Sequence, residues 1–140
     1  QLAASLLDAN VEGVSVNGEF LADRRPVLAP KFTASGFIQY EKPVAALKGF
    51  LSGNMSFNHQ GAHYFDITNS PQSHENAYTL VDARIAYRNE AGTIELAGFV
   101  KNLFNTDHRV YTFDFGAIAG FNQQFYGKPR WFGIQLTLRN

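Results

Sequence analysis

The residues best suited to bind a ligand are aromatic side chains in two connecting segments. Tyr64 and Phe65 belong to the first segment, and the second holds Tyr111, Phe113, Phe115, Phe121, Phe125 and Tyr126. Ring faces can stack on a sugar, a catecholate or a corrin edge, and a nearby arginine can meet an anionic group. We expect most of these rings to pack loop against loop. The ligand-binding hypothesis names Tyr64, Phe65, Arg109, Tyr111, Phe113, Phe121 and Tyr126.

Metal and nucleophile chemistry have weaker support in the sequence. His59 and His63 have the four-residue spacing that suits one face of a helix, but their surroundings are typical of strand and loop, and His74 and His108 stand in separate segments. We therefore expect isolated surface histidines, with no metal site and no cofactor. The Ser-His-Glu run at 73–75 places its side chains apart, because adjacent strand residues point to opposite faces. The sequence predicts no enzyme.

Composition excludes several classes of protein. Hydrophobic residues make up 45% of the 140 positions and charged residues 17%, which is typical of a folded chain. Twelve basic and twelve acidic residues cancel, so we expect no nucleic-acid partner. The chain has no cysteine, which rules out disulfides and thiolate chemistry. No apolar run approaches the roughly 20 residues of a membrane-spanning helix, and the N-terminus does not resemble a signal peptide.

The elements that would carry these residues are two-sided β-strands. Apolar and polar residues alternate over six segments, which is the period of a strand with one apolar and one wet face. We predict strands at about 2–8, 31–41, 46–59, 77–88, 93–104 and 131–139. The residues expected on the apolar, lipid-facing side include Leu47, Leu51, Val81, Ile85, Ile134, Leu136 and Leu138. Those expected on the wet side include Lys48, Asn54, Asp82, Arg84, Gln135 and Arg139.

The connections between these strands alternate between long and short. Short turns are expected near 42–43 and at 89–92, whereas long loops are expected at about 9–30, 60–76 and 105–130. Bacterial outer-membrane barrels combine short periplasmic turns with long extracellular loops in this way. Strands of about 9 to 14 residues exceed the usual five or six of soluble sheets. The fold predicted is therefore all-β, an antiparallel transmembrane β-barrel segment, although a soluble sheet with one wet face shows the same alternation.

Six strands are too few for a closed barrel. The smallest outer-membrane barrels have about eight strands, and an open sheet edge in lipid leaves unpaired backbone groups, each costing several kcal/mol. We therefore expect residues 1–140 to be the C-terminal part of a single, larger barrel domain whose remaining strands lie outside this sequence.

Three short segments carry a family resemblance. Asn102-Leu103-Phe104-Asn105, the Tyr111 that follows, and Gly127-Lys128-Pro129-Arg130 before the last strand resemble the C-terminus of TonB-dependent outer-membrane receptors. The resemblance implies structural roles for Asn102, Leu103, Phe104, Asn105, Gly127, Pro129 and Arg130. One departure is the final Arg139-Asn140, where the family usually ends on an aromatic residue.

The resemblance also implies a function. Its members are barrels of about 22 strands closed by a plug domain, located in the bacterial outer membrane. They take up a scarce nutrient such as a siderophore-bound iron, a cobalamin or a glycan. The implied partners are outer-membrane lipid, the rest of the barrel with its plug, the nutrient, and the periplasmic TonB energy-coupling protein through an N-terminal part absent here. The alternatives are a passive porin and a soluble β-sheet carbohydrate-binding module.

Overall fold

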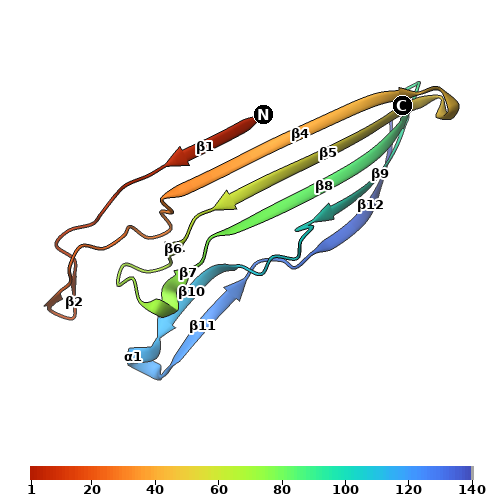
Figure 1. The fold of residues 1–140 in the computed structure, drawn as a ribbon. Helices are drawn as coiled ribbons and strands as arrows, with labels where there is room; N and C mark the ends of the chain where they lie inside the picture. The colour runs from red at the N-terminus through yellow and green to blue at the C-terminus, as the bar shows by residue number, and fades with distance from the viewer. Residues whose placement is uncertain (140) are drawn as a thin grey trace.

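The molecule is built around one antiparallel β-sheet, with short turns at one end and long loops at the other (Figure 1). The computed structural model describes residues 1–139. Six strands form the sheet in the order β1-β4-β5-β8-β9-β12, so each strand pairs with its neighbours along the chain. Their bounds are Leu2–Leu6 (β1), Phe32–Val44 (β4), Gly49–Gln60 (β5), Tyr78–Asn89 (β8), Ile94–Lys101 (β9) and Trp131–Leu138 (β12). The predicted all-β class and the six alternating strands are confirmed.

The short turns differ in detail from the prediction. β4 continues through the expected turn at 42–43, and the chain reverses instead in a 3-10 turn, η1 (Ala45–Leu47), followed by Lys48 at a φ of 47°. Leu47 and Lys48 therefore lie in a turn, and their predicted assignment to the two faces of a strand is wrong. β9 also ends earlier than predicted, at Lys101, because Asn102 adopts a left-handed φ of 52°, outside the β region.

The long loops contain small sheets that the sequence analysis did not predict. Loop 7–31 holds the hairpin β2 (Ser15–Val16) and β3 (Glu19–Phe20). Loop 61–77 holds β6 (His63–Tyr64), β7 (His74–Glu75) and the 3-10 turn η2 (Pro71–Ser73). Loop 102–130 holds β10 (Arg109–Phe115), the helical turn α1 (Gly116–Ala119) and β11 (Phe121–Tyr126). These segments extend the structure well beyond one end of the main sheet (Figure 1).

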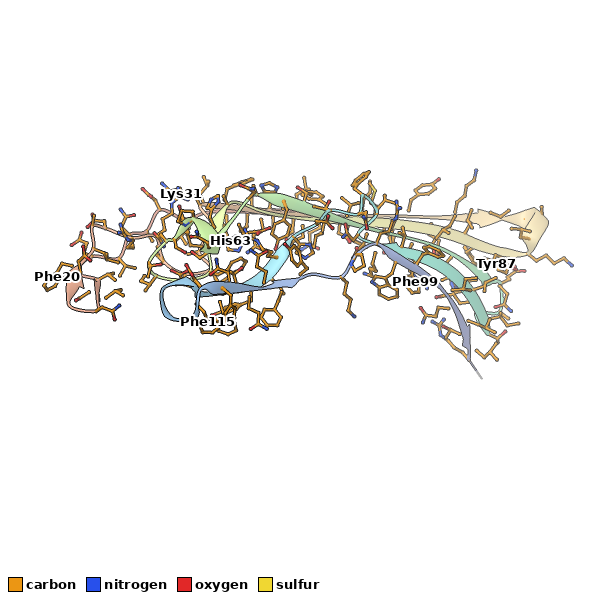
Figure 2. The ribbon with its side chains drawn as sticks, turned by 90° about the horizontal axis from the view of Figure 1, so that it is seen from below. Phe20, Lys31, His63, Tyr87, Phe99 and Phe115 are labelled. Carbon is orange, nitrogen blue, oxygen red and sulfur yellow. The ribbon has the colours of Figure 1, made fainter. Side chains whose placement is uncertain are left out.

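The two faces of the main sheet differ in chemistry. Register places Ile38, Met55, Ala83, Val100 and Phe132 in one row across five strands, and the rows toward the short turns on this face are also rich in apolar side chains. We call this side the apolar face. The opposite side, the polar face, carries the row Gln39, Asn54, Arg84, Phe99 and Gly133. Figure 2 shows that the sheet is curved, with Phe99 of the polar face on the inside of the curve.

Little apolar surface is buried. Among residues 1–116 and 119–139, the buried hydrophobic residues are Phe65, Ala86 and Ala97, and the two alanines pair directly across β8 and β9. The apolar face is uncovered, with Phe132 and Ile134 each 81% exposed. A water-soluble domain of this size normally buries its large apolar side chains in one core. Within the same residues, no helix has the length and apolar character needed to cross a membrane.

Candidate ligand-binding surface

Asn102 connects the end of β9 to the beginning and end of loop 102–130. Its backbone N–H donates to Asp82 Oδ1 on β8 at 3.0 Å, and its side-chain Nδ2 donates to the carbonyls of Thr106 and Lys128. Its Oδ1 accepts the N–H of Thr106 at 2.8 Å. Asn102 is 6% exposed, so these bonds satisfy a nearly buried amide. One side chain thus holds both ends of the longest loop against the sheet.

The other motif residues lie around the same junction. Asn105 adopts a φ of 54° and accepts the backbone N–H of Arg130 at 2.9 Å, while the Leu103 N–H donates to Val81. The Gly127 N–H donates to the His108 carbonyl, and a Cβ at Gly127 would overlap the imidazole of His108. The segments 102–105 and 127–130 therefore lie in contact with each other. This contact is consistent with the structural roles predicted for their residues.

Arg109 lies at the base of the β10–β11 hairpin and joins it to loop 61–77. Its Nε donates to Glu75 Oε2 at 2.6 Å, and its backbone N–H donates to Glu75 Oε1 at 3.1 Å. The remaining guanidinium nitrogens donate to the carbonyls of Gln72 and His74. Both charged side chains are mostly buried, at 17% and 9% exposure. Each of the three guanidinium nitrogens of Arg109 therefore makes a hydrogen bond within the protein.

Loop 61–77 is joined in turn to loop 7–31. The Asn69 amide accepts the Arg25 N–H at 2.7 Å and donates to the Arg25 carbonyl at 3.1 Å. Close by, the Leu28 N–H donates to the Tyr64 carbonyl at 2.9 Å. Positive φ angles at Leu28 and Asn69 shape the two chains for this contact. All three long loops are thus linked into one assembly.

The β10–β11 hairpin carries five aromatic residues on one side, three of which belong to the ligand-binding hypothesis. Register pairs Tyr111 with Phe125 and Phe115 with Phe121, and Phe113 lies between these pairs on the same side. Neighbouring rings are in contact, with centroids 4.8 Å apart for Tyr111 and Phe113, and 5.5 Å apart for Phe115 and Phe121. We call these five residues the aromatic face. Figure 2 shows Phe115 on the side of the hairpin directed away from His63.

The predicted ligand residues outside this face have different surroundings. Phe65 is 2% exposed and packs on His63 and Tyr111, so it is a loop core residue. Tyr64 packs on His74 with centroids 5.0 Å apart. Tyr126 is exposed on the opposite side of β11, where its hydroxyl donates to Gln124 at 2.8 Å. Phe65 therefore offers no free surface to a ligand, whereas the aromatic face and Tyr126 do.

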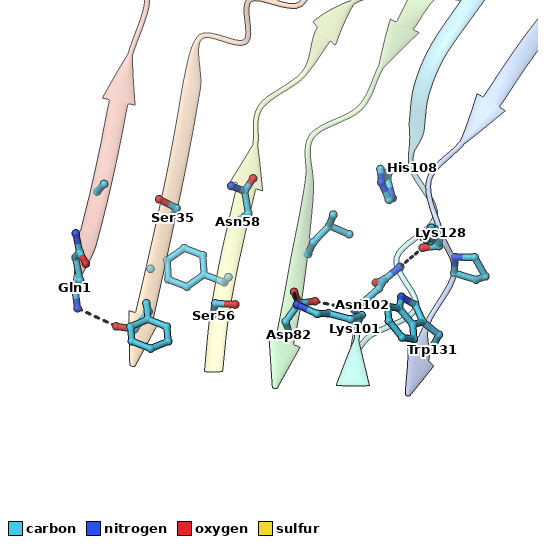
Figure 3. Close-up of a pocket in the computed structure, with 16 residues that line it drawn as sticks. Gln1, Ser35, Ser56, Asn58, Asp82, Lys101, Asn102, His108, Lys128 and Trp131 are labelled. Atoms are coloured by element: carbon cyan, nitrogen blue, oxygen red, sulfur yellow. Dashed lines mark hydrogen bonds and ion pairs between the residues drawn. The ribbon is translucent and has the colours of Figure 1, made fainter. Parts of the chain in front are cut away.

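A second candidate surface is a hollow on the inside of the sheet, next to the Asn102 junction (Figure 3). It has a volume of about 660 Å³ and is open to one side. The Lys101 ammonium pairs with Asp82 at 2.7 Å within it. Its other polar and aromatic lining residues include Ser35, Ser56, Asn58, His108, Lys128 and Trp131.

Charges on the polar face form ion pairs between different strands. Arg84 bonds Glu95 at 2.6 Å, and Arg88 bonds Glu41 across β5 at 3.1 Å. Arg139 approaches the second oxygen of Glu95 at 3.7 Å. These pairs all lie on the inside of the curve and none lies on the apolar face, as an apolar environment outside the sheet would require.

The structure offers no cluster of metal ligands within residues 1–139: no group of three or more His, Asp or Glu side chains there could hold an ion. His59 instead bonds Thr79 at 2.9 Å, and His108 stacks on Tyr78 with centroids 4.7 Å apart. The expectation of surface histidines is wrong for His63 and His108, which are buried, and sequence reasoning also missed the structural role of Glu75. The partners of His108 and Glu75 are distant in sequence, so no local pattern marked them.

No protein-family model, curated protein or solved structure matches this chain.

Proposed function

We propose that this chain forms part of the wall and outer loops of an outer-membrane receptor for energised, TonB-dependent uptake of a scarce nutrient. The observation that carries the proposal is the two-sided sheet: large apolar side chains are uncovered on its outer side, and the ion pairs gather on its inner side. Lipid is the environment that stabilises such an outer side, while a polar lumen or plug suits the inner side.

The two ends of the sheet support the same orientation. The turns 45–48 and 90–93 are short, as periplasmic turns of bacterial barrels are. The three long loops at the other end are linked through Asn69 and Arg109, and they would form the extracellular surface that meets the nutrient. The junction built from Asn102, Asn105 and Arg130 adds the segments that resemble the receptor family.

The open edges support a larger barrel. Within residues 1–139 the outer edges of β1 and β12 have no strand partner. Unpaired backbone groups are costly in lipid, so further strands would pair with both edges to complete the wall.

The first experiment measures the environment of the two faces in the protein expressed from its complete gene. Spin labels at Leu136→Cys and Gln135→Cys report adjacent residues on opposite sides of β12, in membranes. The proposal expects the label at 136 to collide mainly with dissolved oxygen, and the label at 135 to meet a water-soluble nickel complex. A protein recovered in the aqueous fraction, with both labels in water, would instead support a soluble module.

A second measurement separates a receptor from a passive porin. Uptake by a TonB-dependent receptor stops when the energy-coupling protein is deleted or the proton gradient is collapsed. Diffusion through a porin continues under both conditions. Uptake that survives both treatments would overturn the proposal for active transport while leaving the membrane orientation in place.

A further inference from the structure

We propose that the aromatic face of the β10–β11 hairpin binds a neutral oligosaccharide. The inference rests on the proposed function in one respect, that loop 102–130 lies in water outside the membrane. It narrows the nutrient from three chemical classes to one, and its argument comes from the hairpin itself.

The rings form a continuous apolar surface that water can reach. Phe113, Phe121 and Phe125 are 42%, 55% and 41% exposed, although each contacts another ring of the face. Two aromatic cross-strand pairs, Tyr111 with Phe125 and Phe115 with Phe121, set the length of this surface along the hairpin. Exposed rings gathered in this way are typical of a binding surface rather than of an isolated apolar side chain.

The surface has no formal charge. The thirteen positions from 115 to 127 contain no Asp, Glu, Lys, Arg or His. Of the flanking cations, Arg109 is paired with Glu75, and the Lys128 ammonium lies near the ring of Trp131, 6.0 Å from its centre. The nearest carboxylate, Asp114, accepts bonds from Ser70 and Gly116 and would repel an anion. An anionic iron complex would therefore meet no counter-charge here.

A neutral hydrogen-bonding group lies among the rings. All six residues of β11 are exposed, and amides occupy its centre: Asn122 and Gln124 lie on the side away from the aromatic face, and Gln123 lies on the aromatic face. Gln123 lies directly across from Phe113 on the aromatic face. An amide both donates and accepts, so it matches hydroxyl groups, while a ring matches the apolar C–H face of a sugar. Every sugar unit of an oligosaccharide has both hydroxyl groups and an apolar C–H face.

The hairpin is also held in place before any ligand arrives. The Arg109–Glu75 pair fixes its base, and the 2.9 Å bond from Ser70 Oγ to Asp114 Oδ2 fixes a point further along β10. A surface ordered in advance loses less entropy on binding.

The test is calorimetric titration of the protein expressed from its complete gene, in detergent, with maltohexaose, cellohexaose and laminarihexaose. Ferric tris(catecholate) serves as the anionic probe with aromatic rings. We expect at least one neutral hexasaccharide to bind and the anionic probe to bind at least tenfold more weakly. Phe121→Ala should weaken saccharide binding about tenfold, as removal of a stacked ring does. The matched control is Phe20→Ala, which deletes an exposed ring in loop 7–31 and should change the affinity less than twofold.

Gln123→Ala provides a second variant that removes only an amide. It should also weaken binding, and both hairpin variants should keep the wild-type heat-modifiable gel mobility. Absence of binding by all three saccharides, preferential binding of the iron complex, or equal effects of Phe121→Ala and Phe20→Ala would overturn the inference. None of these outcomes bears on which face of the sheet meets lipid, because the spin-label measurement tests that separately. A water-soluble protein that still binds a saccharide through Phe121 would overturn the receptor and leave the inference intact.

Discussion

Arg109 and Glu75 are 34 residues apart in sequence, yet the guanidinium of one binds the carboxylate of the other, with Nε 2.6 Å from Oε2. Glu75 also accepts the backbone N–H of Arg109, so the contact fixes main chain as well as side chain. Two loops that leave different strand pairs are held together at this point. The Arg109–Glu75 pair is therefore one of the contacts that join the outer loops, beside the packing of Phe65.

Glu75→Gln should release the hairpin from loop 61–77. The variant leaves a mostly buried guanidinium without its counter-charge, a change that costs about 3 kcal/mol in buried pairs. Hydrogen exchange should become faster over 109–115 and stay unchanged in β8. The control is Glu41→Gln, which breaks the more exposed pair with Arg88 and should cost less than about 1 kcal/mol. Equal exchange in the two variants would contradict the linking role of Glu75.

Asn102→Ala should loosen both ends of loop 102–130. Alanine at a φ of 52° costs about 1 kcal/mol, and the N–H of Thr106 loses its acceptor, which adds about 1 to 3 kcal/mol. Proteolysis of folded protein should then cut near 102–107. Asn102→Gly keeps the backbone conformation but not the amide, so it separates the two effects. A glycine variant as resistant as wild type would show that the amide contributes nothing.

Leu136→Arg should impair assembly far more than Gln135→Arg. Leu136 lies on the apolar face and is 60% exposed, whereas Gln135 lies on the polar face beside it. In the proposed orientation the first variant places a charge in lipid, at a cost of about 2 to 4 kcal/mol near the bilayer midplane. The measurement is the fraction of protein that shows heat-modifiable mobility on a gel. Similar fractions for the two variants would contradict the assignment of the faces.

Gly133→Ala should destabilise the last strand pair. The ring of Phe99 covers Gly133, and an added Cβ would lie 2.7 Å from its Cζ atom. Overpacking of this kind costs about 1 to 3 kcal/mol. Gly98→Ala is the matched control, because nothing lies within 4 Å of the position its Cβ would take. Denaturant titration should show a lower midpoint only for the first variant, and Phe99→Leu should restore part of the loss.

Alternation of side chains made the main sheet predictable. In β12 the large apolar residues recur at every second position, and a shift of one residue would move all of them to the other face. The boundaries were less predictable, because Lys48 and Asn102 leave the strands through left-handed backbone conformations that depend on contacts made elsewhere. Alternation in β10 was also visible in the sequence, but the ring-rich segment was interpreted as loop.

The sequence showed that the hairpin is rich in aromatic residues. It did not show how these residues and Arg109 are arranged relative to the other loops. The rings of the hairpin were noted in the sequence, and five of them share one face, but the ligand-binding hypothesis did not include Phe115 and Phe125. Arg109 was named as a contact for an anion, and its partner is a carboxylate from another loop. The burial of Phe65 follows from the same association of loops. Contacts between loops form between residues that are tens of positions apart. Local sequence patterns carry no information about which of these residues will meet.

The sequential strand order has a kinetic consequence. Hairpins β4–β5 and β8–β9 each close over a short turn, so they can form early and independently of the rest. Pairing of β5 with β8, and of β9 with β12, must wait until the intervening loops close, which costs more entropy. The sheet would then grow by adding preformed hairpins to one another, and the pairing of β9 with β12 would follow the folding of loop 102–130. A substitution at Asn102 would therefore slow the pairing of β12 with β9 during folding, in addition to any effect on the stability of the folded protein.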